Sequence, residues 1–409
     1  MNLTHYIKLK LLRHSLACLA LVTCSATLAS AAVTWHDIQF GGFASQGFIA
    51  NTGNNDYLGE TSKGTFDFRE YAVNSSYSTG QFRVGAQAFG QKLGDYGDDK
   101  IKLDWATIDY QPAQWFGLRV GRVKTPRGLY NEALDVDSVR PFVLLPQSVY
   151  DARLRDFNSA FNGGMLFGNV GIGHAGSLDY RAYYGDIPLS TSSGASDYFN
   201  NDAPIPNAYI GMDYTVGGSL FWNTPVQGLR TGYSFTRYNN FGAGRSAPAG
   251  GPPGAPNLII DRTTPKYDRH LLSVEYIKGD WTFAGEAGED TATYTLALPS
   301  NVAGNGNTQD FTAKYAYISA ARRFTPRFEA GSYVSYSYDV ITGIAPMNLK
   351  QLDYALSAHF DINDHLLVKA EVHYMDGSGK LFNTATHAQP IEGRDNSWVL
   401  FAVKTTLSF

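Results

Sequence analysis

The last twelve residues of the chain, Trp398 to Phe409, alternate between apolar and polar positions. One face carries Val399, Phe401, Val403, Thr405, Leu407 and Phe409. The other face turns polar over its last three members, which are Lys404, Thr406 and Ser408. Alternation at period two over this length predicts a β-strand with one apolar face and one face toward water. Such a strand is typical of two settings, the edge of a soluble sheet and the wall of a membrane barrel.

Similar alternating stretches continue from Asp37 to the C terminus, for example Phe82–Leu93 and Leu229–Tyr238. Ala208–Trp222 is predicted as one strand, and the Gly- and Pro-rich segment Asn239–Pro265 as a loop. The pattern gives about sixteen strands of roughly ten residues, joined alternately by short turns and long loops. It predicts an all-β fold, a transmembrane antiparallel β-barrel of about 16 strands. A soluble β-sandwich or propeller would not separate its connections by length so regularly.

Membrane crossing by helices is not predicted. Beyond residue 31 the sequence has no run of about 18 apolar residues, the length that a spanning helix needs. A closed barrel is the other way to pair every backbone amide in lipid. Its apolar strand faces would contact lipid, while alternate positions such as Arg181, Glu286 and Lys369 would line a water-filled interior. Pointing an Arg or Lys toward the bilayer centre would instead cost about 2–4 kcal/mol.

The N-terminal segment has the features of a cleaved export signal. It opens with three basic residues, Lys8, Lys10 and Arg13. An apolar core, Leu16–Val22, and a small-residue cleavage site, Ala29–Ala31, follow. We therefore predict a signal peptide at 1–31 and a single barrel domain at 32–409. The shortness of the apolar core argues against a membrane anchor, and a lipoprotein signal ending at Cys24 is a weaker alternative.

Composition and charge argue against disulfide bonds and against nucleic-acid binding. The chain has 33 basic and 37 acidic residues, for a formal net charge of −4. Loss of residues 1–31 removes three basic residues and both cysteines, so 30 basic residues face 37 acidic ones and the net charge becomes −7. A disulfide framework is thereby excluded, and the lack of a basic excess argues against nucleic acid as a partner. The net acidity favours cations over anions as solutes.

The longest connection in the first half, Lys124–Asn158, carries the clearest functional pattern. Six basic and five acidic residues lie from Arg122 to Asp156. The same segment holds the apolar run Val143–Leu145, which is unusual for a loop in open water. It is the third long loop and follows the fifth predicted strand. Two placements fit these residues, a loop that folds into the barrel and a compact surface loop outside it.

With this order of elements, with the stretch Gly121–Tyr130 and with its terminal Phe409, the chain resembles the trimeric sixteen-stranded porins of Gram-negative bacteria. The resemblance covers the whole mature chain as a pattern. It implies a third loop folded into the lumen and a homotrimer in the cell outer membrane, in contact with lipid and lipopolysaccharide. It also implies passive diffusion of small hydrophilic solutes and ions, no cofactor, no bound metal, and a role for Phe409 in the assembly signal.

The resemblance also suggests which side chains form the constriction. In such porins, loop carboxylates face arginines of the barrel wall, and these charges set the ion preference. The corresponding loop acids here are Asp135, Asp137, Asp151 and Asp156. The corresponding wall arginines are Arg83, Arg119 and Arg230. The short Pro-Glu-Phe-Gly-type core of enteric porin loops is missing from this segment.

One position breaks the alternation of charged and apolar residues. If Leu118 and Val120 face lipid, Arg119 faces the interior and Arg122 faces outward. Two explanations are open: Arg122 lies beyond the membrane, or a β-bulge turns it inward.

Other functions stay open beside general diffusion. A substrate-selective porin would show lumenal ladders of basic residues for anions, or rows of aromatic residues for sugars. A barrel enzyme of the outer-membrane phospholipase type would need a Ser/His pair on its lipid-facing side, and the predicted strands offer none. A secreted, soluble β-rich binding protein is the remaining alternative. We predict a protein that is not an enzyme, and interpret Gly171–Gly176, a dinucleotide fingerprint in letters only, as a turn between strands.

Overall fold

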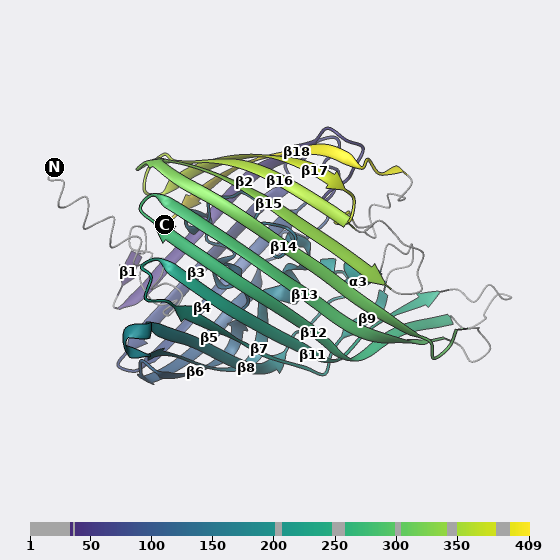
Figure 1. The fold of residues 1–409 in the computed structure, drawn as a ribbon, viewed down its shortest axis with the longest axis horizontal. Helices are drawn as coiled ribbons and strands as arrows, with labels where there is room; N and C mark the ends of the chain where they lie inside the picture. The colour runs from purple at the N-terminus through teal and green to yellow at the C-terminus, as the bar shows by residue number, and fades with distance from the viewer. Residues whose placement is uncertain are drawn as a thin grey trace.

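The computed structural model describes residues 33–35, 37–200, 207–247, 258–298, 304–341, 350–381 and 393–409. The predicted signal peptide at 1–31 lies outside these residues. Sixteen long strands of the described part form one antiparallel sheet that closes on itself (Figure 1). The prediction of an all-β barrel with about sixteen strands is therefore confirmed.

The strands follow one another around the barrel in chain order. The first eight are β2 (Ile38–Asn51), β3 (Phe68–Thr79), β4 (Phe82–Leu93), β5 (Lys102–Ala113), β6 (Phe116–Lys124), β7 (Ala160–Gly171), β8 (Ser177–Asp186) and β10 (Tyr214–Asn223). The second eight are β11 (Leu229–Ala247), β12 (Leu258–Lys278), β13 (Trp281–Ala297), β14 (Thr308–Thr325), β15 (Phe328–Ile341), β16 (Lys350–Asp361), β17 (Leu366–Gly377) and β18 (Ser397–Ser408). Two short strands, β1 (Val33–Trp35) and β9 (Asn207–Gly211), pair with β2 and β11.

Helical elements are short and lie in the connections. They are η1 (Asn131–Ala133), η2 (Asp137–Val139), η3 (Ala152–Leu154), α2 (Arg155–Asn158), η4 (Gly173–Ala175) and α3 (Gly194–Asn200). Within the described ranges, none of the helices has the length and apolar character that crossing a membrane requires.

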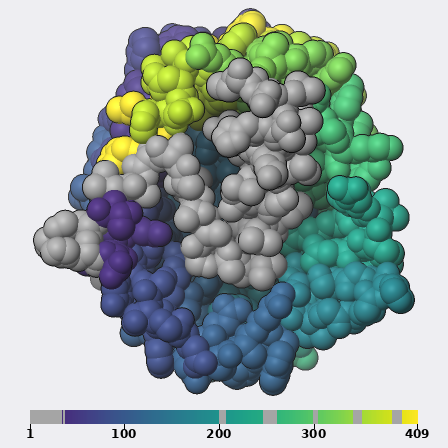
Figure 2. All heavy atoms as spheres, turned by 90° about the vertical axis from the view of Figure 1, so that its left-hand side faces the viewer, coloured from purple at the N-terminus to yellow at the C-terminus, as the bar shows by residue number. Residues whose placement is uncertain are grey.

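The barrel closes between its first and last strands, β2 and β18. Nine residue pairs join them, the last being Ser408 opposite Phe43. Beyond that pair, the N–H and the C=O of Phe409 each bond to Gly42 at 3.0 Å. In the end-on view of Figure 2, the purple start and the yellow end of the described chain lie next to each other. The last residues therefore form a strand of the barrel wall, and not the free edge of a sheet.

Connections at the two ends of the barrel differ in length. At the end where the C terminus lies, on the left of Figure 1, short turns join the strands. Gly80 between β3 and β4 and Gly279 between β12 and β13 have φ of 56° and 61°, values that a residue with a side chain rarely adopts. The opposite end carries the long connections, as the sequence pattern predicts.

Two predicted boundaries are wrong. Ala208–Trp222 is not one strand, because β9 pairs with the outer part of β11 while β10 pairs with β8. Most of Asn239–Pro265 is not loop, because β11 and β12 extend past the neighbouring strands and pair with each other up to Ala247 and Leu258. Glycine occurs both in turns and in twisted strands. The number of glycines in this hairpin therefore does not distinguish a loop from a strand.

The barrel wall is apolar outside and polar inside, as β16 illustrates. Its exposed members are Tyr354 (44% exposed), Leu356 (60%) and Phe360 (44%). Its polar alternate members, all at or below 3% exposure, are Gln351, Asp353, Ser357 and His359. A continuous apolar outer surface of this kind suits hydrocarbon and would be unfavourable in water.

The position of Arg122 follows from its neighbours on β6 and β7. Val123 and its cross-strand partner Phe161 are fully buried in an inner apolar cluster. Arg122, one residue earlier, therefore points outward. Its Nε donates to the carbonyl of Asp104 at 3.0 Å. The bulge that would turn Arg122 inward is not found, because β6 pairs with β7 in one continuous register from Gly117 to Lys124.

Candidate functional site

Residues 125–159, the connection between β6 and β7, are largely buried. Their backbone does not join the strand ladder, so its polar groups need other partners. Side chains of β11, β13, β16 and β17 supply them, from positions that alternate with the exposed apolar ones. These side chains are Ser234, Glu286, Ser357, Lys369 and Glu371. The 125–159 segment is thus bonded to the polar face of the sheet.

Two residues of β17 hold the middle of this segment. The ammonium of Lys369 donates to three backbone carbonyls, those of Asp137 (2.6 Å), Arg140 (2.8 Å) and Phe142 (3.3 Å). The carboxylate of Glu371 accepts the N–H of Val143 at 2.9 Å and that of Leu144 at 3.0 Å, one on each oxygen. The apolar run 143–145 is consequently buried, which explains why it is not polar like an ordinary loop.

A buried histidine supports Glu371. Nε2 of His373 lies 2.7 Å from Glu371 and Nδ1 lies 2.9 Å from Asp353. The hydroxyl of Tyr333 donates to Asp353 at 3.0 Å. With a carboxylate on each side, the imidazole keeps both carboxylates in position. The Glu371 carboxylate is thereby oriented toward the backbone N–H groups that it binds.

A first group of charges lies where the segment leaves β6. Asp135 is 2.9 Å from the ammonium of Lys124 and pairs closely with the guanidinium of Arg155. Asp104 of β5 lies 2.6 Å from Lys124 and 2.7 Å from Arg155. Burial by itself raises the pKa of Asp135, but the charges of Arg155 and Lys124 outweigh burial and hold that pKa well below its usual range. Asp135 is therefore an anion at neutral pH.

A second group of charges centres on Asp137. Its carboxylate lies 2.5 Å from Arg140 and 2.9 Å from Lys404, and it accepts the hydroxyl of Thr406 at 2.5 Å. Lys404 also reaches Glu70 of β3 at 2.5 Å. Burial raises the pKa of Asp137, yet Lys404 and Arg140 hold it well below its usual range. This group ties the segment to the strands on both sides of the barrel closure.

The other two predicted loop acids have separate environments. Asp151 pairs with Arg153 at 2.7 Å, and the guanidinium of Arg153 lies 5.1 Å from the ring centre of Tyr57. Asp156 is exposed in the first turn of α2. Asp151 is thus a structural contact of the segment, whereas Asp156 faces solvent.

The three predicted wall arginines are inward-facing, but their contacts differ from those expected. Arg119 binds Asp109 through two hydrogen bonds of 2.7 and 2.8 Å, and Arg83 lies 3.9 Å from the same carboxylate. Arg230 lies 4.2 Å over the ring of Phe221. The cations that the structure brings to Asp135 and Asp137 are Lys124, Arg140, Arg155, Lys369 and Lys404. Alternation along β17 and β18 already marks Lys369 and Lys404 as inward residues.

A narrow gap remains between the 125–159 segment and strands β3, β4 and β18. Its charged lining consists of Glu70, Arg140, Arg155 and Lys404. The gap contains about 440 Å³ of space between atoms, open solvent included.

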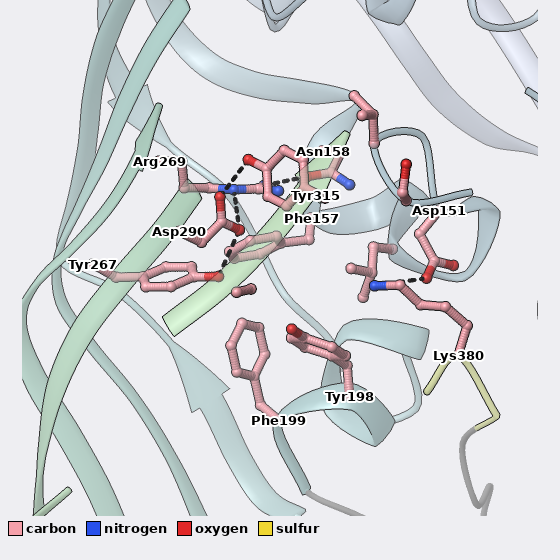
Figure 3. A pocket seen from close by; sticks show the side chains of 14 residues that line it. Asp151, Phe157, Asn158, Tyr198, Phe199, Tyr267, Arg269, Asp290, Tyr315 and Lys380 are labelled. Atoms are coloured by element: carbon pink, nitrogen blue, oxygen red, sulfur yellow. Dashed lines mark hydrogen bonds and ion pairs between the residues drawn. The ribbon is translucent and has the colours of Figure 1, made fainter. Parts of the chain in front are cut away.

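A second cavity is bounded by the end of the segment, α3 and β12–β14 (Figure 3). Its aromatic walls are Phe157, Tyr198, Phe199, Tyr267 and Tyr315. Arg269 and Asp290 pair at one side at 2.8 Å. The ammonium of Lys380 lies 4.0 Å from Asp151 and 5.8 Å from the ring centre of Tyr198. Lys380 and Asp151 thus form an ion pair without a direct hydrogen bond.

Comparison with known proteins gives similarity in fold. No protein-family model matches the chain, and no curated protein sequence matches it. OmpF of Salmonella typhi, solved in complex with daunomycin, is 12% identical with a TM-score of 0.55 over 92% of this chain and 99% of that one. The outer membrane channel DcaP of Acinetobacter baumannii is 10% identical with a TM-score of 0.55 over 93% and 100%. An anion-selective porin from Comamonas acidovorans is 12% identical with a TM-score of 0.54 over 91% and 99%. The chain therefore has the fold of outer-membrane porins.

Proposed function

We propose that the chain is an outer-membrane porin through which small hydrophilic solutes and ions diffuse passively. The observation that carries this proposal is the inverted wall, apolar outside and charged inside, closed into a barrel. Such a surface is stable in a bilayer, and a charged interior retains water. The fold shared with three outer-membrane channels supports the same function.

The 125–159 segment is proposed to cross the lumen and form the constriction. Its hydrogen bonds to Glu371, Lys369 and Glu286 support this placement, because all three stand on the polar face of the wall. In this proposal Asp135 and Asp137 orient the cations around the opening. The predicted residues Asp151, Asp156, Arg83, Arg119 and Arg230 contribute charge to the approaches on either side.

The proposal includes export by a signal peptide at 1–31 and assembly into the outer membrane, with lipid and lipopolysaccharide as partners. It also includes a homotrimer. OmpT of Vibrio cholerae, solved in a trimer form, is 12% identical with a TM-score of 0.53 over 93% of this chain and all of that one. Its similar fold supports a trimer here. Catalysis, a cofactor and a metal have no part in the proposed function.

Two measurements test the proposed function. The purified protein should need detergent, and its mobility on a gel should change on boiling, as expected of a barrel that resists unfolding by detergent. In a planar bilayer it should then produce stepwise increases in current. A protein that stays folded and monomeric in detergent-free buffer, or that gives no current, would refute the proposal.

A substrate-selective porin is the second candidate, and the cavity of Figure 3 favours it. Aromatic rings can stack on a flat ligand, and the ammonium of Lys380 can bind a carboxylate. Benzoate combines these two features. For this candidate, benzoate should reduce the current at lower concentration than acetate, and Lys380→Met should abolish the difference. If benzoate and acetate reduce the current equally, the selective site is refuted and general diffusion is the better proposal.

A further inference from the structure

We infer that the gap beside the 125–159 segment passes small anions in preference to cations. The inference rests on the proposed porin function and goes one step beyond it, to the class of solute. The anions concerned are chloride, phosphate and short carboxylates, since each presents a compact negative charge that guanidinium and ammonium groups bind.

Most of the charged side chains that border the gap are cationic. Arg140 and Arg155 reach it from the segment, and Lys404 reaches it from β18. Among the described residues that border it, Glu70 of β3 is the single acid. An ion in the gap therefore meets three positive charges and one negative charge.

The acids that pair with these cations lie behind them. Asp135 and Asp137 are not among the described residues that border the gap. Their side chains are 5% and 2% exposed, against 8% for Arg155 and Arg140. Each ion pair thus presents its positive end to the gap. Dipoles arranged in this way attract anions even where the formal charges cancel.

The sign at the gap is opposite to the sign expected of the whole chain. Residues 32–409 carry 30 basic and 37 acidic residues, for a net charge of −7. Charges on the outer loops act through water and are screened within about 8 Å at physiological salt. An ion in the gap is much closer to Arg140, Arg155 and Lys404 than to those loops. The local charge therefore sets the preference, and the overall acidity does not.

The test is the reversal potential of the full-length mature protein in a planar bilayer under a KCl gradient. We expect a reversal potential of the sign that a chloride-selective channel produces, with chloride about three to ten times as permeant as potassium. Clefts lined by charges of one sign raise the local concentration of the opposite ion by about tenfold or more. We expect a ratio at or below that value because Glu70 offsets one of the cations. A reversal potential of the sign given by potassium would overturn the inference while leaving the porin function intact. No current at all would overturn both.

Two variants with opposite effects locate the preference. Arg140→Gln removes a cation from the gap, whereas Asp137 keeps Lys404 and Lys369 as partners. We expect its chloride preference to fall by at least half. Glu70→Gln removes the one bordering acid and should raise the preference.

Lys63→Gln is the matched control, because it also removes one positive charge, from a side chain that is 76% exposed outside the gap. It should keep the wild-type reversal potential. Heat-dependent mobility on gels establishes that each variant is folded. If Arg140→Gln and Lys63→Gln shift the reversal potential equally, the preference does not originate at the gap and the inference is wrong.

Discussion

Replacing Lys369 by methionine is the sharpest test of how the 125–159 segment is held. The Lys369 side chain is fully buried, and its ammonium donates to the carbonyls of Asp137, Arg140 and Phe142. Methionine has a similar length and no hydrogen-bond donor. The Lys369→Met variant therefore fills the same space and leaves three carbonyls without this donor.

The size of the effect follows from these contacts. A buried ion pair that loses one partner typically costs about 3–5 kcal/mol, and each buried carbonyl left without a donor adds to the cost unless water reaches it. We expect about 3–5 kcal/mol to be lost from the attachment of the segment. Backbone pairing of β17 with β16 and β18 does not involve this ammonium. The barrel itself should stay closed.

Single-channel recording distinguishes these two effects. Lys369→Met should give a larger mean conductance and more current noise than the wild type, because the segment is less firmly attached. The temperature at which the barrel unfolds on a gel should change little. Lys314→Met is the control, because the side chain of Lys314 on β14 is 62% exposed. If Lys369→Met conducts like this control, with equal noise, the segment does not depend on Lys369 and our reasoning fails.

Three other perturbations test separate parts of the structure. Deleting Phe409 should reduce the amount of folded barrel in the outer membrane, since its two hydrogen bonds to Gly42 complete the closure; normal assembly would exclude this role. Deleting residues 143–147 should raise the conductance if the segment lies in the lumen, whereas an unchanged conductance would place it outside. The folded-state pKa of Asp135 is depressed, so its contribution is present above the unfolded value of about 3.9 and is lost only as pH falls through the lower, folded value. Asp135 therefore stays ionised between about pH 5 and pH 7. The Asp135→Asn variant should show the same pH dependence of the reversal potential over this range as the wild type.

Strand positions could be predicted well because period two is a local signal. Each alternate apolar residue must reach lipid, so a strand such as β16 can be identified from its own residues. The single predicted strand at Ala208–Trp222 failed for the complementary reason. Its division into β9 and β10 depends on pairing with β8 and β11, which alternation within one segment does not encode.

Charge partners could be predicted only in part. Inward residues of β17 and β18 follow from alternation, so Lys369 and Lys404 were identifiable as lumenal. Their contact with Asp137 joins residues more than two hundred positions apart along the chain. The predicted partners of the loop acids were arginines of the barrel wall, whereas Asp135 takes Lys124 at the end of β6 and Arg155 in α2. The cations that a buried acid meets depend on the path of the 125–159 segment through the barrel, and that path becomes known only from the fold.

The pairing of β2 with β18 has a consequence for biogenesis. The edge of β2 bonds to β18, which lies more than three hundred residues later in the chain, so this edge stays unpaired until β18 has been made. An open edge of unpaired amides and carbonyls invites pairing with other chains. Any stage of folding at which β2 is present without β18 therefore leaves this edge exposed to such pairing.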